Sequence, residues 1–258
     1  MDAVLLINDG QHRRRGIEHA IAEDRTLAEQ TVAVTIFFDA GLRKAQQMFA
    51  DINTNQVKPS SALNMVYDHR NDFGRWVLEV LDAMPGIKRR VEMETSSVGA
   101  KRGKLWSVVA IRKTILSLCQ LTEKSFADLD QEQRDHHKVH VVEFFNSLAA
   151  YVPCWRAMVD HEIPAAEVKA EMLIGQTVFL EALAVAGATI SNTGSGWDKC
   201  EAWKAMSVYK SDARWEGLCI VSGRMVKTVA AVKSTAVELL RIASVLIPPE
   251  MREFGRVS

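Results

Sequence analysis

The stretch AVLLINDGQHRRRGI, residues 3–17, decides how the start of the chain folds. A run of apolar, partly β-branched residues ends at Asn8-Asp9-Gly10, and a basic cluster then leads into a helical pattern. This order predicts a strand over residues 3–7, a tight turn, and a helix over residues 16–29.

A turn of this kind exposes backbone N–H groups and the positive end of a helix dipole, and both favour a bound phosphate. Gly10 lets the backbone come close to a ligand. Arg13 can bind phosphate in a bidentate way, and Gln11 and His12 can donate further hydrogen bonds. An ordinary turn with solvated arginines has the same sequence, so a phosphate site and a solvated turn are both open interpretations.

The composition limits the classes of function. The 258 residues include 32 Lys+Arg and 32 Asp+Glu, so the formal net charge is +0 and DNA binding requires a local basic patch. Four scattered cysteines without a Cys-x-x-Cys pair indicate reduced thiols. Residues 4–7 are too short for the core of a signal peptide, and the apolar stretch 172–190 contains Gln176 and Glu181. We therefore expect a cytoplasmic protein without a membrane span.

Downstream of the turn, the patterns are mainly helical. We predict a second strand over residues 31–38 and a hairpin or an apolar loop over residues 218–226. Helices are predicted after a cap at Ser60 or Ser61 and over residues 42–52, 73–84, 105–121, 128–151, 164–190, 198–206 and 228–246. The fold class is thus α+β and predominantly helical, with a partial α/β unit over residues 1–70 and a mainly helical domain over residues 71–258. Two strands do not make a stable sheet, so we expect the missing strands upstream of this chain.

A second basic segment lies in the middle of the chain. Lys88-Arg89-Arg90 and Lys101-Arg102-Gly103-Lys104 surround a short predicted strand at residues 91–95. These cations can contact a phosphate backbone, or they can simply be solvated. His136 and His140 are one helical turn apart, but no third ligand is evident, and we predict no metal site. The six tryptophans are expected in the core rather than in base stacking.

Several short motifs resemble those of DGQHR-domain proteins. These motifs are Asp9-Gly10-Gln11-His12-Arg13, Gly16-Ile17, residues 47–55 (QMFADINTN), Trp215-Glu216-Gly217 and Ser222-Gly223-Arg224-Met225. Taken together, they resemble the DndB family more than other DGQHR-domain proteins. A more distant likeness is to ParB-type partition proteins and sulfiredoxins, which share a strand, a Gly-x-x-Arg turn, a helix, a strand and a helix with an Asn-containing end. We expect this fold in the partial N-terminal unit.

The resemblance to DndB implies a DNA-binding transcriptional repressor of a bacterial DNA phosphorothioation gene cluster. In that modification, sulfur replaces a non-bridging phosphate oxygen of DNA. The implied partner is the promoter DNA of its own gene cluster, with other DNA-modification proteins and a second copy of the chain as further partners. The residues expected to contact DNA are Arg14, Arg15, Lys88, Arg89, Arg90, Lys101, Arg102 and Lys104.

The ParB-like resemblance implies an alternative function, a nucleotide-binding component that works as an ATPase- or CTPase-like switch. Its cofactor would be a nucleoside triphosphate with Mg²⁺. The residues implied to bind phosphate or nucleotide are Asp9, Gly10, Gln11, His12, Arg13, Asn53 and Asn55. Between the two functions, we expect a regulator rather than an enzyme, and nucleotide hydrolysis is the alternative.

Overall fold

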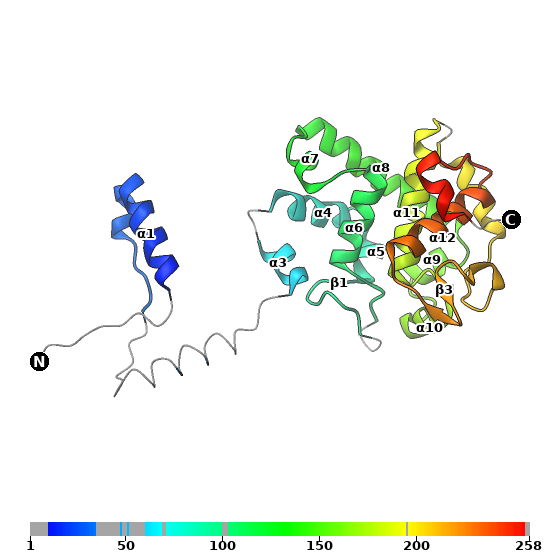
Figure 1. The fold of residues 1–258 in the computed structure, drawn as a ribbon, viewed down its shortest axis with the longest axis horizontal. Helices are drawn as coiled ribbons and strands as arrows, with labels where there is room; N and C mark the ends of the chain where they lie inside the picture. The colour runs from blue at the N-terminus through cyan, green and yellow to red at the C-terminus, as the bar shows by residue number, and fades with distance from the viewer. Residues whose placement is uncertain are drawn as a thin grey trace, which may run out of the picture. The chain divides into compact units, whose positions relative to one another are not determined.

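The computed structural model describes residues 10–34, 47, 51, 60–68, 71–99, 103–194 and 196–255. Contacts divide the chain into two units, Met1–Lys58 and Pro59–Ser258, and Figure 1 colours both in chain order. Helix α3 (Ser61–Tyr67) packs against helices of the second unit. The division into sequence domains at residue 70 stays a prediction.

In the first unit, α1 (Gln11–Glu23) is followed by the 3-10 helix η1 (Arg25–Glu29). The prediction of one helix over residues 16–29 is wrong at its start and in its continuity. Gly10 has a left-handed φ of 99°, and the helix begins directly after it. Asp24 then adopts an extended conformation, and its side chain accepts from the Thr26 N–H, which starts the separate 3-10 turn.

The predicted strands of the first unit receive little support. Residues 3–7 lie outside the described residues, as does most of the segment 31–38. Residues 31–34 are described and are not in a strand, and Val32 and Val34 are 62% and 76% exposed. Gln47 is helical, as expected for the helix over residues 42–52, and donates to Asp51 Oδ1 at 2.8 Å. The ParB/sulfiredoxin-like fold of this unit stays a prediction.

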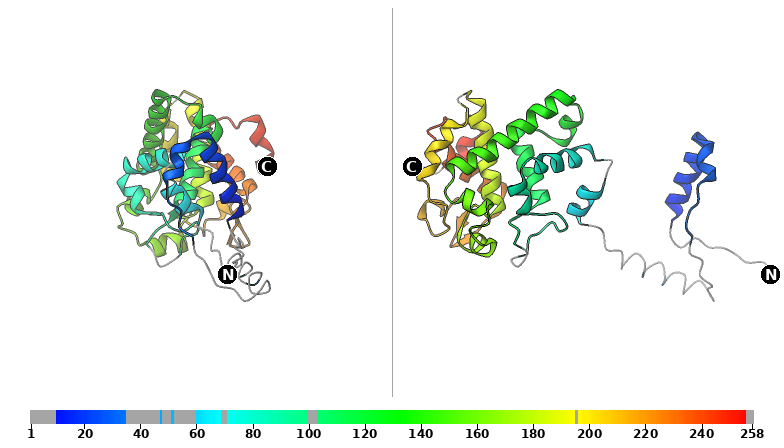
Figure 2. Two further views of the ribbon diagram at one scale, coloured as in Figure 1. Left: turned by 90° about the vertical axis from the view of Figure 1, so that its left-hand side faces the viewer. Right: turned by 180° about the vertical axis from the view of Figure 1, so that it is seen from behind.

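The second unit is built mainly from helices, which Figures 1 and 2 show from three sides. After α3 its α-helices are α4 (Asp72–Asp82), α5 (Pro85–Arg89), α6 (Val108–Cys119), α7 (Glu123–Ala127), α8 (Gln131–Tyr151), α9 (Trp155–Val159), α10 (Ala165–Glu171), α11 (Thr177–Asn192) and α12 (Val229–Ile242). Three 3-10 helices complete the described set: η2 (Gly196–Ala205), η3 (Ala213–Trp215) and η4 (Pro249–Phe254). The predicted class, α+β and predominantly helical, is confirmed.

Helix α11 is the centre of this unit. It packs against both α6 and α12, and it lies among them in Figure 1. Between Val178 and Ile190, Val185 and Thr189 are half-buried and the other residues are buried, which is the pattern of a core helix. Its charged residue Glu181 is also buried, and Glu181 Oε2 forms an ion pair with Lys113 Nζ at 2.7 Å. The interpretation of the apolar stretch 172–190 as a buried helix is thus confirmed for residues 177–190, and residues 172–176 are buried or half-buried but not helical.

The prediction of a single helix over residues 164–190 is wrong. The chain leaves the helix after α10, and the Leu173 N–H donates to the Val208 carbonyl at 2.8 Å. The Lys210 N–H donates to the Glu171 carbonyl in the same way, so residues 171–173 pair with residues 208–210 instead of continuing the helix. At Gly175 a Cβ atom would lie 2.9 Å from Val168 Cγ1, so only glycine allows the chain to pass so close to α10.

The short strands are β1 (Val91–Glu92), which pairs in parallel with β2 (Trp106–Ser107), and β3 (Ile220–Val221), which pairs in antiparallel with β4 (Arg224–Met225). Because Trp106–Ser107 is in a strand, α6 begins three residues later than the predicted helix at residue 105. The predicted helix over residues 73–84 is observed as α4, which ends at Asp82, and Pro85 occupies the first position of the next helix, α5.

Tryptophans occupy the core as expected. Trp76, Trp106, Trp155, Trp203 and Trp215 are buried. The sixth, Trp197, is partly buried and packs against the Phe144 ring at 5.4 Å.

Candidate nucleic-acid interface

The helix start at Gly10 is the part of the predicted phosphate turn that the structure describes. Gln11, His12 and Arg13 form the first turn of α1, and all three are exposed. The helix has neither a capping side chain nor an acidic residue in this turn. A Cβ atom on Gly10 would lie 3.6 Å from Arg13 Nη2, so the guanidinium lies against the start of the helix. The positive end of the dipole and a cation thus lie together.

Of the other predicted site residues of the first unit, two are described and lie on the surface, and three lie outside the described residues. Arg14 and Arg15 are exposed on α1, and Arg14 Nε forms an ion pair with Glu18 at 2.8 Å. Asp9, Asn53 and Asn55 lie outside the described residues. Whether the two asparagines lie near the turn therefore stays a prediction.

A basic surface of the second unit begins at the end of α5. Arg89 is exposed, and among the described residues it has no acidic partner within ion-pair distance. Lys88 pairs with Asp82, and Lys104 Nζ donates to the Arg89 carbonyl at 2.8 Å. The hydrogen bond from Lys104 holds the two segments together at this edge. We call Lys88, Arg89 and Lys104 the α5 basic cluster.

Arg90 does not belong to this surface, and the prediction that its side chain contacts DNA is wrong because the side chain is buried. The residue is 2% exposed. Its guanidinium donates from Nε to the Met158 carbonyl at 2.8 Å, from Nη2 to the Ile163 carbonyl at 2.9 Å and from Nη1 to the Gly103 carbonyl at 3.3 Å. Burial, followed by the nearby Arg89, lowers the pKa of Arg90, but a guanidinium remains charged at any physiological pH. Arg90 is a structural cation that joins three segments.

The loop between β1 and β2 is anchored on both flanks. Ser60 Oγ donates to the Glu94 carbonyl, and Lys169 Nζ donates to the Val98 carbonyl at 2.9 Å. On the other flank, Gly103 accepts from Arg90. Lys101 and Arg102 themselves lie outside the described residues, so their contact with DNA stays a prediction.

His161 is a residue that the sequence reasoning missed. It lies in the turn between α9 and α10, is exposed, and has a left-handed φ of 66°. Partial desolvation and the cations Arg90, Arg89 and Lys104 lower its pKa, in that order, and Asp160 acts in the opposite direction. No sequence pattern signals this residue, because it lies more than fifty positions beyond Lys104.

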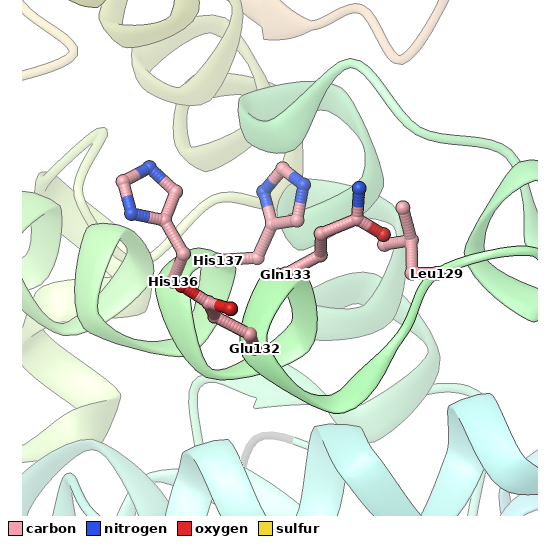
Figure 3. Close-up of a pocket in the computed structure, with 5 residues that line it drawn as sticks. All are labelled: Leu129, Glu132, Gln133, His136 and His137. Atoms are coloured by element: carbon pink, nitrogen blue, oxygen red, sulfur yellow. The ribbon is translucent and has the colours of Figure 1, made fainter.

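The histidines of α8 lie elsewhere in the second unit. His136 and His137 line a depression of about 290 Å³ together with Leu129, Glu132 and Gln133. Figure 3 shows both imidazole rings projecting to the same side of the helix. His140, one turn after His136, packs on Trp197 with ring centroids 5.2 Å apart. Among the described residues, no three His, Cys, Asp or Glu side chains gather as a metal site.

Three of the four cysteines, Cys119, Cys200 and Cys219, offer little thiolate chemistry. Burial raises the pKa of Cys119 and that of Cys200 to about 12, and it also raises the pKa of Cys219. These three thiols are therefore protonated at neutral pH and poorly nucleophilic.

The C-terminal motifs form one structural feature. Ser222 and Gly223 have φ values of 51° and 72°, as in a type I′ turn, and they connect β3 to β4. The Glu216 carboxylate accepts from the Ser222 N–H at 2.6 Å, and the buried Trp215 donates to the Ser207 carbonyl at 2.9 Å. The two motifs that are separated in the sequence thus support the same hairpin. The hairpin, rather than an apolar loop, is what residues 218–226 form.

Comparison with known families decides the relationship. The family model of DndB, described as DNA-sulfur modification-associated, matches residues 1–245. The chain belongs to the DndB family. The matched range includes the first turn of α1, the α5 basic cluster and the hairpin of β3 and β4. Membership of the DndB family associates this chain with DNA sulfur modification.

No curated protein and no solved structure matched the chain significantly. Among the described helices, none has the length and apolar character that crossing a bilayer demands.

Proposed function

We propose that this chain is a DNA-binding transcriptional regulator, acting as a repressor of the gene cluster for DNA phosphorothioation. The observation that carries the proposal is the DndB family match over residues 1–245. A regulator of this kind works in the cytoplasm on the promoter of its own cluster. Other DNA-modification proteins and a second copy of the chain are its further partners.

The charge distribution supports a local rather than a global attraction to DNA. The net charge is +0, so affinity must come from grouped cations. Arg13-Arg14-Arg15 on α1 and the α5 basic cluster are such groups. Each cation that neutralises a phosphate releases counterions, which makes the binding depend on salt.

The test is a fluorescence anisotropy titration of a labelled duplex from the cluster's promoter, repeated at several salt concentrations. The variants are the doubles Arg14→Ala/Arg15→Ala, Arg89→Ala/Lys104→Ala and Lys101→Ala/Arg102→Ala. Each contacted phosphate contributes about one unit to the salt slope, so each double should lower the slope by about two. Lys124→Ala/Lys199→Ala, on exposed positions of α7 and η2, is the matched control and should leave it unchanged.

Failure of the unaltered chain to bind the promoter duplex at low salt would remove the proposal. Equal affinity for promoter and unrelated duplexes would leave a DNA-binding protein but not a specific repressor. A reporter gene behind the promoter, repressed by the unaltered chain and released by the double variants, tests the regulatory step.

The second candidate function is a switch that binds a nucleoside triphosphate with Mg²⁺. It is favoured by the uncapped start of α1, where Arg13 lies beside Gly10 and the first turn has no acidic residue. Isothermal titration calorimetry with each nucleoside triphosphate and Mg²⁺ tests it. Heat that disappears in Arg13→Ala would support the switch, and no heat with any triphosphate would exclude it. Binding without hydrolysis would make the nucleotide a ligand of the regulator rather than a substrate.

A further inference from the structure

The turn between α9 and α10 is fixed against the α5 basic cluster by the buried Arg90. The Met158 carbonyl accepts from Arg90 Nε at 2.8 Å and from the His161 N–H at 3.4 Å. Ile163, on the other side of His161, accepts from Arg90 Nη2 at 2.9 Å. One guanidinium therefore holds both flanks of the residue, and His161 cannot leave this edge without breaking buried hydrogen bonds.

Arg90 connects the same turn to the cations of the proposed DNA surface. It follows Arg89 directly in the chain, and its Nη1 donates to the Gly103 carbonyl next to Lys104. The Lys104 ammonium in turn donates to the Arg89 carbonyl. Three segments that are far apart in the sequence thus place Arg89, Lys104 and His161 on one edge.

The charges around His161 are mostly positive. Three cations act on its pKa, Arg89 at the end of α5, Arg90 directly after it and Lys104 in the loop before β2, and Asp160 of its own turn acts in the opposite direction. Glu162, the other neighbouring acid, lines a separate depression with Cys154 and Arg156. Because cations outnumber the acid, the site would attract an anion, and a bound anion would in turn favour the protonated imidazole.

We propose that His161 contacts a DNA phosphate together with Arg89 and Lys104, and that its protonation strengthens this contact. The inference rests on the proposed DNA-binding function and adds a residue and a pH dependence to it. The three groups are an imidazole, a guanidinium and an ammonium on an exposed edge rather than in a cavity. Such an arrangement fits the phosphates of a polymer running across the surface better than a small enclosed ligand.

The pH dependence follows from proton linkage. In the free protein the pKa of His161 lies below its ordinary value because of desolvation and the neighbouring cations. A phosphate beside the ring favours the imidazolium, so binding takes up a proton. The affinity for DNA should therefore rise as the pH falls from about 8 to about 6, through the range in which histidine titrates.

The experiment compares the full chain with His161→Asn in the anisotropy assay with the promoter duplex. Asparagine tolerates the left-handed backbone of residue 161 and stays neutral at every pH. Between about pH 8 and pH 6, the affinity gain of the unaltered chain should exceed that of His161→Asn by about three- to tenfold, the effect of one charge-assisted hydrogen bond. At about pH 6 the variant should also lose about one unit of salt slope.

His19→Asn, on the exposed surface of α1, is the matched histidine control and should keep the full affinity gain. Matching thermal unfolding curves establish that His161→Asn is folded. An affinity gain on acidification that is the same in His161→Asn as in the unaltered chain would overturn the inference while leaving the regulator function intact. Absence of duplex binding by the unaltered chain at both pH values would overturn both.

Discussion

At the scale of single residues, Arg90 shows that a run of consecutive basic residues does not indicate which of them are exposed. Lys88, Arg89 and Arg90 are consecutive, yet Arg89 is exposed while Arg90 is 2% exposed and donates to three backbone carbonyls. A planar guanidinium can serve three acceptors that are fixed in different directions, and an ammonium cannot reproduce that fork.

Arg90→Lys should therefore lower the free energy of unfolding by about 2–4 kcal/mol, because buried carbonyls lose charge-assisted donors. Arg89→Lys, the adjacent exposed position, should change it by less than about 0.5 kcal/mol. Urea denaturation followed by circular dichroism measures both. Equal stability of the two variants would mean that the three hydrogen bonds of Arg90 contribute nothing.

At the scale of elements, the packing around α11 depends on a glycine. A Cβ atom at Gly187 would lie 2.6 Å from Phe144 Cε2 on α8 and 3.2 Å from Leu118 Cδ1 on α6. The glycine is thus the point at which three helices approach one another closely. The sequence pattern of α11 shows its apolar character but not this contact.

Gly187→Ala should lower the free energy of unfolding by about 1–3 kcal/mol, because overpacking of the core exceeds the gain of about 1 kcal/mol in helix propensity. Gly16→Ala is the matched control, since no atom lies within 4 Å of its added Cβ. It should raise the helical signal of α1 without a loss of stability. A Gly187→Ala protein more stable than the unaltered chain would refute this description of the helix packing.

Helix α8 should make the stability depend on pH through His140. Burial, followed by the neighbouring His137, lowers the pKa of His140, and Glu143 opposes this effect. The unfolded state then binds more protons than the folded state near and below the ordinary histidine pKa. The stabilising contribution is therefore complete above that pKa and is lost as the pH falls towards the lowered value.

The unaltered chain should lose more stability than His140→Gln when urea denaturation is repeated from about pH 7.5 down to about pH 5.5. His19→Gln, on the exposed face of α1, should show the loss of the unaltered chain. A loss in His140→Gln as large as in the unaltered chain would exclude His140 as its origin.

At the scale of the whole molecule, the two units differ in how they are stabilised. Among the described residues, the buried hydrophobic side chains run from Ala62 to Met251 and all belong to the second unit. The described helices of the first unit, α1 and η1, contain no buried residue. The core formed by the described residues thus lies in the second unit.

A fragment from Pro59 to Ser258 should therefore fold by itself and unfold cooperatively, with a midpoint within a few degrees of the full chain. Thermal unfolding followed by circular dichroism compares the two. A fragment without a cooperative transition would show that residues 1–58 are needed for the core. If the fragment still binds the promoter duplex with a reduced salt slope, the α5 basic cluster contacts DNA independently of α1.

The sequence by itself determined the features that depend on neighbours along the chain. Ser60, which the sequence offered together with Ser61 as a helix cap, accepts the Leu63 N–H three residues ahead. The Ser222-Gly223 turn, which fits the hairpin interpretation of residues 218–226, needs only two residues with positive φ. The motifs that identify the DndB family are of the same local kind. Such features can be predicted because their partners lie within a few residues.

Only the tertiary structure decided where α10 ends and which cations are exposed. The helix does not continue through Leu173, because the Leu173 N–H donates to the Val208 carbonyl. Arg90 is buried, unlike its neighbour Arg89, because its guanidinium donates to the carbonyls of Met158 and Ile163, 68 and 73 positions away. The same buried guanidinium fixes the turn that carries His161 next to the chain segment that carries Arg89. The physical reason is that a buried hydrogen-bonding group takes whichever partner the folded chain brings to it, and this choice leaves no periodic signal in the sequence.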